Sequence, residues 1–336
     1  MTHTGHGGDL ISLEGAIDLH FHTYPDLFPR LTDDLEVAQL AAAEGMRALV
    51  LKSHIESTVS RAYLTRRLVP QVEVYGGIVL NTYVGGLNPA AVDAALRLGG
   101  KIVWMPTIDS AYHAERHGGT GRYDAQSGGR VSQEGISILD ADGRLVPQVD
   151  EIVELVVEHG AALATAHLSP REIKQLVPHA LKAGVEKMII THPFFKVPGL
   201  ALDELAELAA LGAMPEFEYC GMSAAWQYQS SALVVEAVRR IGASRCLLVS
   251  DSGQRHNPAA PEGLRVLAQT LYERGLPAED VRRMLVDNPA AVLGLDRERA
   301  APSAEERAYA AGLLARAEQR NGAPLEPALA GGDGGA

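Results

Sequence analysis

The sequence has few cysteines and no long hydrophobic run. Its only two cysteines, Cys220 and Cys246, are too few for a disulfide framework in a chain of 336 residues, so we expect buried thiols in a reducing compartment. No apolar stretch approaches the roughly eighteen residues that cross a membrane, and residues 1–14 lack the basic and apolar regions of a signal peptide. These absences predict a cytoplasmic protein that makes no membrane contact.

Positive charge is also scarce. The chain has 30 Lys and Arg against 42 Asp and Glu, a formal net charge of −12, and it shows no basic cluster of the kind that attracts nucleic acid or anionic lipid. Because 46% of the residues are hydrophobic, the chain has enough apolar material for a large core. We therefore expect a soluble globular enzyme with no nucleic-acid partner.

Short apolar runs recur along the chain, each after an amphipathic segment that ends on glycine. Glycine is suited to this place because the residue after a helix often needs a positive φ. Near-continuous apolar runs are typical of parallel strands covered by helices, and eight alternations predict a closed α/β barrel, the (β/α)₈ or TIM barrel. The eight runs are 15–20, 47–53, 72–80, 101–106, 161–167, 187–192, 214–219 and 246–251.

The barrel is predicted over residues 15–296, after an N-terminal extension over 1–14. A long polar insertion over 109–147 interrupts it after strand four, and residues 136–146 within it read as a hairpin around an Asp-Gly turn. Insertions of this length are usually lids or binding loops. A C-terminal helix is expected over 297–320, followed by a disordered tail over 321–336, which has little to bury.

Metal-ligand residue types gather at the predicted strand ends. In a barrel, function sits where strands end and loops begin. The His-x-His spacing of His20 and His22 puts both imidazoles on one face of a strand, where they can bind one ion. Single histidines mean little, but the joint placement of several at strand ends indicates a metal site. The other such residues are Lys52, His54, His167, His192, Glu216, Glu218 and Asp251.

This set resembles the amidohydrolase superfamily, more closely its phosphotriesterase-like branch, over about Ala16 to Leu295. The resemblance implies that His20 and His22 bind the more buried ion and that His167 and His192 bind a second one. Asp251 would ligate metal and handle the proton. The segment Asn288-Pro289-Ala290 is also similar to one that follows the barrel in many members.

One position departs from the family pattern. Many binuclear members carry a carboxylated lysine or a glutamate on strand four, and the sequence offers neither there. Lys52 on strand two is the best substitute, either as a carbamate or as an ammonium paired with Asp18 or a substrate anion. His54, two residues further on, is an alternative ligand. Glu218 is a third candidate bridge, or else a structural acid paired with an arginine.

The resemblance implies one or two divalent ions, with zinc expected and iron or manganese as alternatives. The ions would turn water into hydroxide and polarise a carbonyl or phosphoryl oxygen, and Asp251 would take up the proton or act as a ligand only. The leading hypothesis is hydrolysis of a carboxyl derivative: an amide, ester, lactone or thioester such as an acyl-CoA. The alternatives are a phosphoesterase, a metal-dependent decarboxylase or a barrel without catalysis.

The substrate is expected to be a small molecule, with an anion as one option, and the protein to be a homo-oligomer. Polar loop residues could clamp a carboxylate or phosphate, although loops are polar in any case. The candidates are His113, His117, Arg122, Arg255 and His256. Two further stretches, residues 24–29 and 194–195, could form an apolar wall or simply pack.

Overall fold

The computed structural model describes residues 10–123, 126–295, 304, 308, 309, 311 and 312. Eight parallel strands form its centre and pair in chain order. The barrel closes where Asp251 N donates to His20 O and His22 N donates to Ser252 O, both at 2.8 Å. Every predicted run overlaps one strand, so the predicted barrel is confirmed. The strands are β1 Ile17–His22, β2 Ala48–Lys52, β3 Glu73–Val79, β4 Ile102–Trp104, β7 Ala162–Ala164, β8 Met188–Ile190, β9 Met214–Glu218 and β10 Leu247–Val249.

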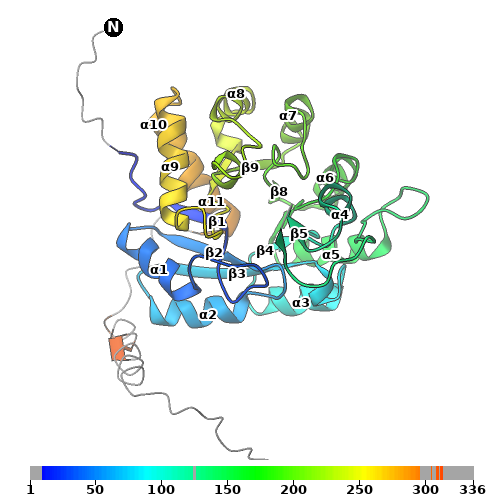
Figure 1. Cartoon of the computed structure of the whole chain (residues 1–336), viewed down its shortest axis with the longest axis horizontal. Coiled ribbons are helices and arrows are strands. Elements are labelled where there is room, and N and C mark those ends of the chain that lie inside the picture. The colour runs from blue at the N-terminus through cyan, green and yellow to red at the C-terminus, as the bar shows by residue number, and fades with distance from the viewer. Residues whose placement is uncertain (1–9, 124–125, 296–303, 305–307, 310, 313–336) are drawn as a thin grey trace, which may run out of the picture.

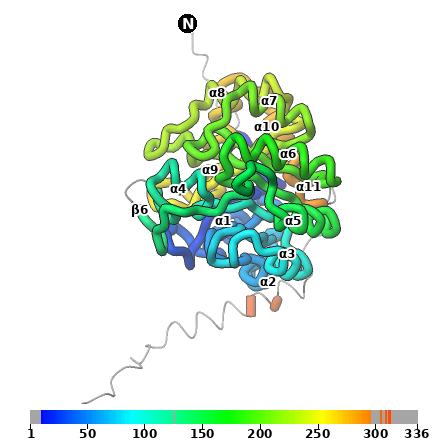
Figure 2. The backbone as a smooth tube through the Cα atoms, turned by 90° about the vertical axis from the view of Figure 1, so that its right-hand side faces the viewer, coloured from blue at the N-terminus to red at the C-terminus, as the bar shows by residue number. Residues whose placement is uncertain are grey.

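Helices surround the strands. Figures 1 and 2 show α2 and α3 on one side of the barrel and α7 and α8 on the opposite side. Among the residues that the structure describes, no helix is both long and apolar enough to cross a bilayer. The longer helices are α1 Asp34–Ala43, α2 Val59–Leu68, α3 Pro89–Arg97, α4 Ala111–His117, α5 Pro147–Glu158, α6 Pro170–Ala183, α7 Leu202–Ala210, α8 Ser231–Ile241, α9 Ala260–Glu273, α10 Ala278–Arg282 and α11 Asn288–Leu293. Short helical turns are η1 Thr82–Val84, η2 Cys220–Met222, η3 Ala243–Arg245 and the π-helical η4 Arg283–Asp287.

The start of α6 ties a helix to the insertion. Ser169 Oγ accepts from Glu172 N at 3.2 Å and Glu172 Oε2 accepts from Ser169 N at 2.8 Å, the reciprocal capping box that stabilises a helix N-terminus. The second oxygen, Glu172 Oε1, accepts from Ile138 N at 3.1 Å. The cap residue therefore also anchors the insertion against the outside of the barrel.

The strand interiors are buried, and β1 carries an irregularity beside the candidate ligands. Asp18 pairs with Leu49 but Phe21 pairs with Leu51, so β1 has one more residue than β2 in this interval. A β-bulge of this kind re-aims side chains and is common next to active sites. The apolar side chains of the strands and of the inner helix faces form one continuous core.

The insertion over 109–147 holds α4 and a small antiparallel pair, β5 Arg122–Tyr123 and β6 Gln126–Ser127. The predicted hairpin over 136–146 is reduced to a single bridge between Leu139 and Leu145, with Asp140 N donating to Arg144 O at 2.8 Å. The predicted helix over 297–320 lies outside the described residues apart from five isolated positions, 304, 308, 309, 311 and 312. The tail over 321–336 and most of the extension over 1–14 also lie outside them.

Candidate functional site

The carboxyl ends of the strands bring the predicted ligand residues together in the barrel. β1 supplies His20 and His22, β2 ends on Lys52, and the loops after β7, β8 and β10 supply His167, His192 and Asp251. Each of these residues is buried, with a relative exposure of 7% or less. Polar groups buried to this degree need partners, so the contacts of each one define the site.

A compact group forms around the Asp251 carboxylate. Its Oδ1 lies 3.1 Å from His20 Nε2 and 3.3 Å from His22 Nε2. Each of the three residues offers one ligand atom, and these atoms lie within 4.8 Å of one another. Burial opposes the negative charge, but His20 and His22 outweigh it and hold the pKa of Asp251 well below its usual value. The carboxylate is therefore ionised and suited to a cation.

Glu216 of β9 sets the orientation of His20. Its Oε1 lies 2.7 Å from His20 Nδ1, in a pair that is almost completely buried. A carboxylate can only accept, so Nδ1 carries the proton and Nε2 faces Asp251. The sequence placed Glu216 at this strand end but singled out only Glu218 as a candidate bridge, although both lie on one face of β9 at a spacing of two.

Lys52 is enclosed beside the same histidine. Its Nζ lies 2.8 Å from His20 Nε2 and 5.5 Å from the centre of the Trp104 ring. Burial lowers the pKa of the amine to about 8, although the charges of Asp251 and Glu216 oppose the shift. The described ion pairs do not join Lys52 to Asp18, whose Oδ1 accepts from Ser250 N at 3.1 Å instead. Lys52 therefore belongs to the His20 group.

His54 contacts a buried polar cluster formed by Thr107 and Asn81. Its Nδ1 lies 2.9 Å from Thr107 Oγ1, and Asn81 Nδ2 donates to Thr107 Oγ1 at 2.7 Å and to His54 O at 2.9 Å. The His54 ring stacks on His22 with centroids 4.6 Å apart. Thr107 therefore engages one ring nitrogen, and Nε2 is the nitrogen available to a ligand.

A contact with His113 determines which nitrogen of His167 carries a proton. His113 Nε2 lies 2.6 Å from the carbonyl of Arg122, so Nε2 must be the donor. Burial lowers the pKa of His113 to about 3 and that of His167 well below normal, so both rings are neutral. His113 Nδ1 then accepts, across 2.9 Å, from His167 Nδ1. His167 Nε2 is left without a proton and can bind a cation.

The remaining two candidates carry buried polar atoms without hydrogen-bond partners. Among the described residues, neither His192 Nδ1 nor the carboxyl oxygens of Glu218 have one. Burial raises the pKa of Glu218 well above its usual value, and the nearby Asp251 charge adds to the shift. Such orphaned groups are uncommon in native proteins and indicate an unseen ion or water.

The backbone is strained at two of the candidate ligands. His192 and Asp251 have φ values of 26° and 44°, and Ala166, directly before His167, has 50°. Residues other than glycine rarely adopt positive φ, and such strain clusters at functional sites. The chain therefore turns sharply at each of these strand ends, where His167, His192 and Asp251 leave the barrel wall.

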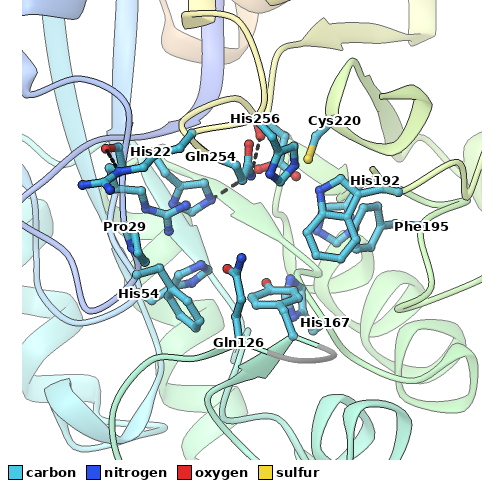
Figure 3. A pocket seen from close by; sticks show the side chains of 16 residues that line it. His22, Pro29, His54, Gln126, His167, His192, Phe195, Cys220, Gln254 and His256 are labelled. Carbon is cyan, nitrogen blue, oxygen red and sulfur yellow. Dashed lines mark hydrogen bonds and ion pairs between the residues drawn. The ribbon is translucent and has the colours of Figure 1, made fainter. Parts of the chain in front are cut away.

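A pocket of about 210 Å³ lies above these residues. Figure 3 shows His54, His167 and His192 around it and the amide of Gln126 reaching in from below. Of the predicted substrate-binding residues, Arg255 and His256 line it. His113 and His117 lie buried in α4, and Arg122 Nη1 donates to Gly118 O at 3.4 Å. The lining residues are His22, Phe28, Pro29, Arg30, His54, Tyr123, Gln126, His167, His192, Phe195, Cys220, Trp226, Asp251, Gln254, Arg255 and His256.

The apolar wall expected from residues 24–29 and 194–195 is present in part. Phe28, Pro29 and Phe195 line the pocket, whereas Phe194 stacks on Phe217 in the core with centroids 5.8 Å apart. Tyr123 and Trp226 complete the wall, and neither was predicted as part of it. Tyr123 comes from β5 in the insertion and Trp226 from the loop after η2, segments whose position depends on tertiary packing.

This donor set fits a divalent ion. Burial lowers the pKa of His22 and His192 and keeps these rings neutral, while Asp251 is ionised. Neutral imidazole nitrogens with a carboxylate are ligands suited to zinc and to other first-row metals. The unpartnered His192 Nδ1 is consistent with that use.

Several solved structures share this fold. A putative 2-pyrone-4,6-dicarboxylic acid hydrolase from Pseudomonas putida matches with a TM-score of 0.54 at 17% identity, over 84% of this chain and 99% of the other. The phosphotriesterase homology protein from Escherichia coli gives a TM-score of 0.54 at 15% identity, over 83% and 99%. An organophosphorus hydrolase from Deinococcus radiodurans gives 0.53 at 16% identity, over 85% and 98%. The predicted resemblance is confirmed at the level of the fold.

Sequence comparisons are more limited. No curated protein matches the chain in sequence. A model described as a family of unknown function, DUF6282, matches residues 15–216, which run from the start of the barrel to β9 and include His20, His22, Lys52, His167 and His192. The match covers more than half of the chain, and the chain belongs to this family.

Proposed function

We propose that the chain is a metal-dependent hydrolase that cleaves a carboxyl derivative, an amide, ester, lactone or thioester. The observation that carries the proposal is the buried group of His20, His22 and Asp251, whose ligand atoms lie within 4.8 Å of one another beneath a pocket. A barrel without function needs no such group at its strand ends.

The ligands divide into two sets. His20, His22 and Asp251 would hold one ion, and His167 with His192 a second, with Lys52 or Glu218 as candidates to link them. Zinc is the proposed metal because it accepts imidazole and carboxylate ligands, and iron and manganese are alternatives. A bound divalent ion supplies Lewis-acid chemistry, since it lowers the pKa of water and polarises the substrate oxygen.

Lys52 suits the carbamate form. Only the neutral amine attacks carbon dioxide, forming a C–N bond and losing one proton. A pKa of about 8 makes that form accessible near neutral pH. An ammonium 2.8 Å from His20 Nε2 would repel a cation bound by that histidine, whereas a carbamate would attract one. Carboxylation of Lys52 therefore supports the same site.

The side chains of the chain itself supply the proton transfers and the geometry. Asp251 is ionised, so it can accept the proton of the attacking water and return it to the leaving group. Glu216 accepts from His20 Nδ1 and orients that ring, and His113 holds His167 in the tautomer with a bare Nε2. The aromatic wall limits access of bulk water, which strengthens electrostatic interactions in the pocket.

Metal analysis and isotope labelling test the proposal. Protein purified without added metal should contain bound zinc, iron or manganese, and one or more of a panel of amides, esters, lactones and thioesters should be hydrolysed. In ¹⁸O-labelled water the carboxylate product should gain one ¹⁸O atom. Negligible metal with no activity after reconstitution would favour a barrel without catalysis. Loss of carbon dioxide without label would show a decarboxylase.

A further inference from the structure

Two arginines share one rim of the pocket. Arg30 lies in the loop after β1 and Arg255 in the loop after β10, and both line the cavity. The loops are joined, because Arg30 and Gln254 form an antiparallel bridge and Leu31 N donates to Gly253 O at 2.9 Å. Arg255 Nε also donates to Arg30 O at 3.4 Å. The two side chains are therefore held on the same side of the pocket.

Arg30 is buried and its guanidinium is fixed. Its side chain is 4% exposed and that of Asp26 is 0% exposed. Asp26 Oδ2 accepts from Arg30 Nε at 2.8 Å and lies 2.8 Å from Nη2 in an ion pair. A guanidinium has five N–H donors, so this contact with one oxygen leaves most of them for a ligand. Asp26 therefore positions the arginine and leaves other N–H groups of the guanidinium available to a ligand.

The two arginines bring positive charge to the pocket. The lining holds the guanidinium groups of Arg30 and Arg255 and one carboxylate, that of Asp251. Within a chain of net charge −12, this local excess of positive groups attracts an anion into the pocket.

Aromatic rings also line the cavity. Phe195 and Trp226 lie 5.7 Å apart between ring centres, and Tyr123 and Trp226 lie 5.8 Å apart. Such faces favour a flat ring placed against them. The volume of about 210 Å³ is below the roughly 300–1,000 Å³ of pockets for drug-sized ligands. The occupant is therefore small, about the size of a single substituted ring.

On the basis of the proposed function, we propose that the substrate is a small planar ring acid. Its carboxylate binds Arg30 and Arg255, its ring lies against Phe195 and Trp226, and its scissile group faces His22 and Asp251. A planar carboxylate matches the guanidinium fork and needs less room than a tetrahedral phosphate. The anion-binding residues are thus on the β1 and β10 loops and not in α4.

Tryptophan fluorescence of the purified, metal-loaded protein tests this inference without turnover. The chain has two tryptophans, and only Trp226 lines the pocket. Benzoate should quench the fluorescence with saturation, and the Trp226→Phe variant should lose that change. Benzamide, which has the same ring without the charge, and phenyl phosphate should each bind about tenfold or more weakly.

Arginine variants show where the carboxylate binds. Arg30→Gln and Arg255→Gln should each reduce benzoate affinity toward that of benzamide, and Arg30→Lys should recover part of it. Arg97→Gln, at an exposed arginine, is the control and should match the parent. Arg255 is itself exposed, so its variant keeps the test decisive if Arg30→Gln does not fold.

Three results would overturn the inference: equal binding of benzamide, tighter binding of phenyl phosphate, or unchanged benzoate affinity in both glutamine variants. The last would place the carboxylate on the metal. Because no turnover is measured, a failure of the proposed hydrolysis would appear separately, as bound benzoate with no reaction on any substrate of the panel.

Discussion

Asp251 contacts both histidines of β1, and its carboxylate is ionised although it is buried. A group in this position can serve as a metal ligand, as a base or as both. Substitution by the isosteric amide distinguishes the two roles, because an amide oxygen still coordinates a cation but cannot accept a proton at neutral pH.

Asp251→Asn should therefore retain bound metal and lose turnover by about 10²- to 10⁴-fold, the contribution expected of general acid–base catalysis. Metal content by mass spectrometry and kcat on the best substrate measure the two effects. Asp203→Asn, at an exposed aspartate, is the matched control. Loss of metal in proportion to activity would instead assign Asp251 a purely ligating role.

His113 does not line the pocket but contacts His167, which makes it a positioning residue. His113→Phe removes the acceptor for His167 Nδ1–H, and metal affinity should fall about 10- to 100-fold. His113→Asn keeps an acceptor oxygen near the place of Nδ1 and should recover most of this loss. The measurement is a metal-binding titration, with ¹⁵N NMR reporting the tautomer of His167.

A control separates this effect from simple packing. His117→Phe alters the ring that stacks on His113 at 4.4 Å and leaves the His113–His167 contact in place, so the tautomer should not change. If His113→Asn weakened metal binding as strongly as His113→Phe, the role assigned to the hydrogen bond would be wrong.

At the scale of elements, the site depends on how the loop after β10 lies against β1. Gly253 makes this approach, with a φ of +128°, and a Cβ there would lie 2.1 Å from His22 O. Only glycine allows a backbone to come so close in this conformation. The same loop joins Arg30 through the Gln254 bridge, so one element positions both metal ligands and the proposed anion site.

Gly253→Ala should force β10 away from β1 and separate Asp251 from His22. We expect a loss of about 1–3 kcal/mol in the free energy of unfolding, together with loss of bound metal, measured by urea unfolding and metal analysis. Gly160→Ala is the control, because Gly160 has a φ of +57° with nothing within 4 Å of its Cβ. Equal metal loss in both variants would contradict the argument.

For the whole molecule, the buried histidines make the fold sensitive to acid. Five of them have a lowered pKa: His22, His54, His113, His167 and His192. A neutral buried histidine gains no proton until the pH is far below its ordinary 6.5, whereas the unfolded chain takes one up. Their contribution to stability is complete above pH 6.5 and is lost as the pH falls toward 3.

Two acids act in the opposite direction over part of this range. Burial raises the pKa of Asp18 to about 7 and that of Glu218 well above normal, so each favours the fold more as the pH falls. Burial opposes it, but the charges of Asp251 and Glu216 raise the pKa of His20 as well, so His20 acts in the same direction as the two acids. The five histidines outnumber these three groups, so stability should decline below pH 6.5, by up to about 1.4 kcal/mol per pH unit for each excess proton.

Urea unfolding at pH 7.5, 6.0 and 5.0 measures this dependence. His179→Gln, at a half-exposed histidine paired with Asp150, should leave the slope unchanged. His54→Gln, which removes one of the five, should lower the stability at every pH but make the decline shallower. A stability that stays flat or rises from pH 6.5 to 5 would contradict the neutral state of the histidines.

The sequence alone determined the barrel and the ends of its strands, because both follow from local rules. Apolar runs separated by helix-ending glycines mark parallel strands, and a spacing of two places His20 and His22 on one face. The parallel order then puts His167, His192 and Asp251 at the same end. These features need only periodicity and chain direction.

Tertiary structure decided how each side chain is used. Glu216 meets His20 across 196 residues of chain, and His113 meets His167 across 54, so no local pattern marks these pairs. His113 and His117 are buried in α4 and do not line the pocket, whereas Arg30 and Trp226 do. Loop residues acquire such positions through packing against distant segments, which sequence periodicity does not encode.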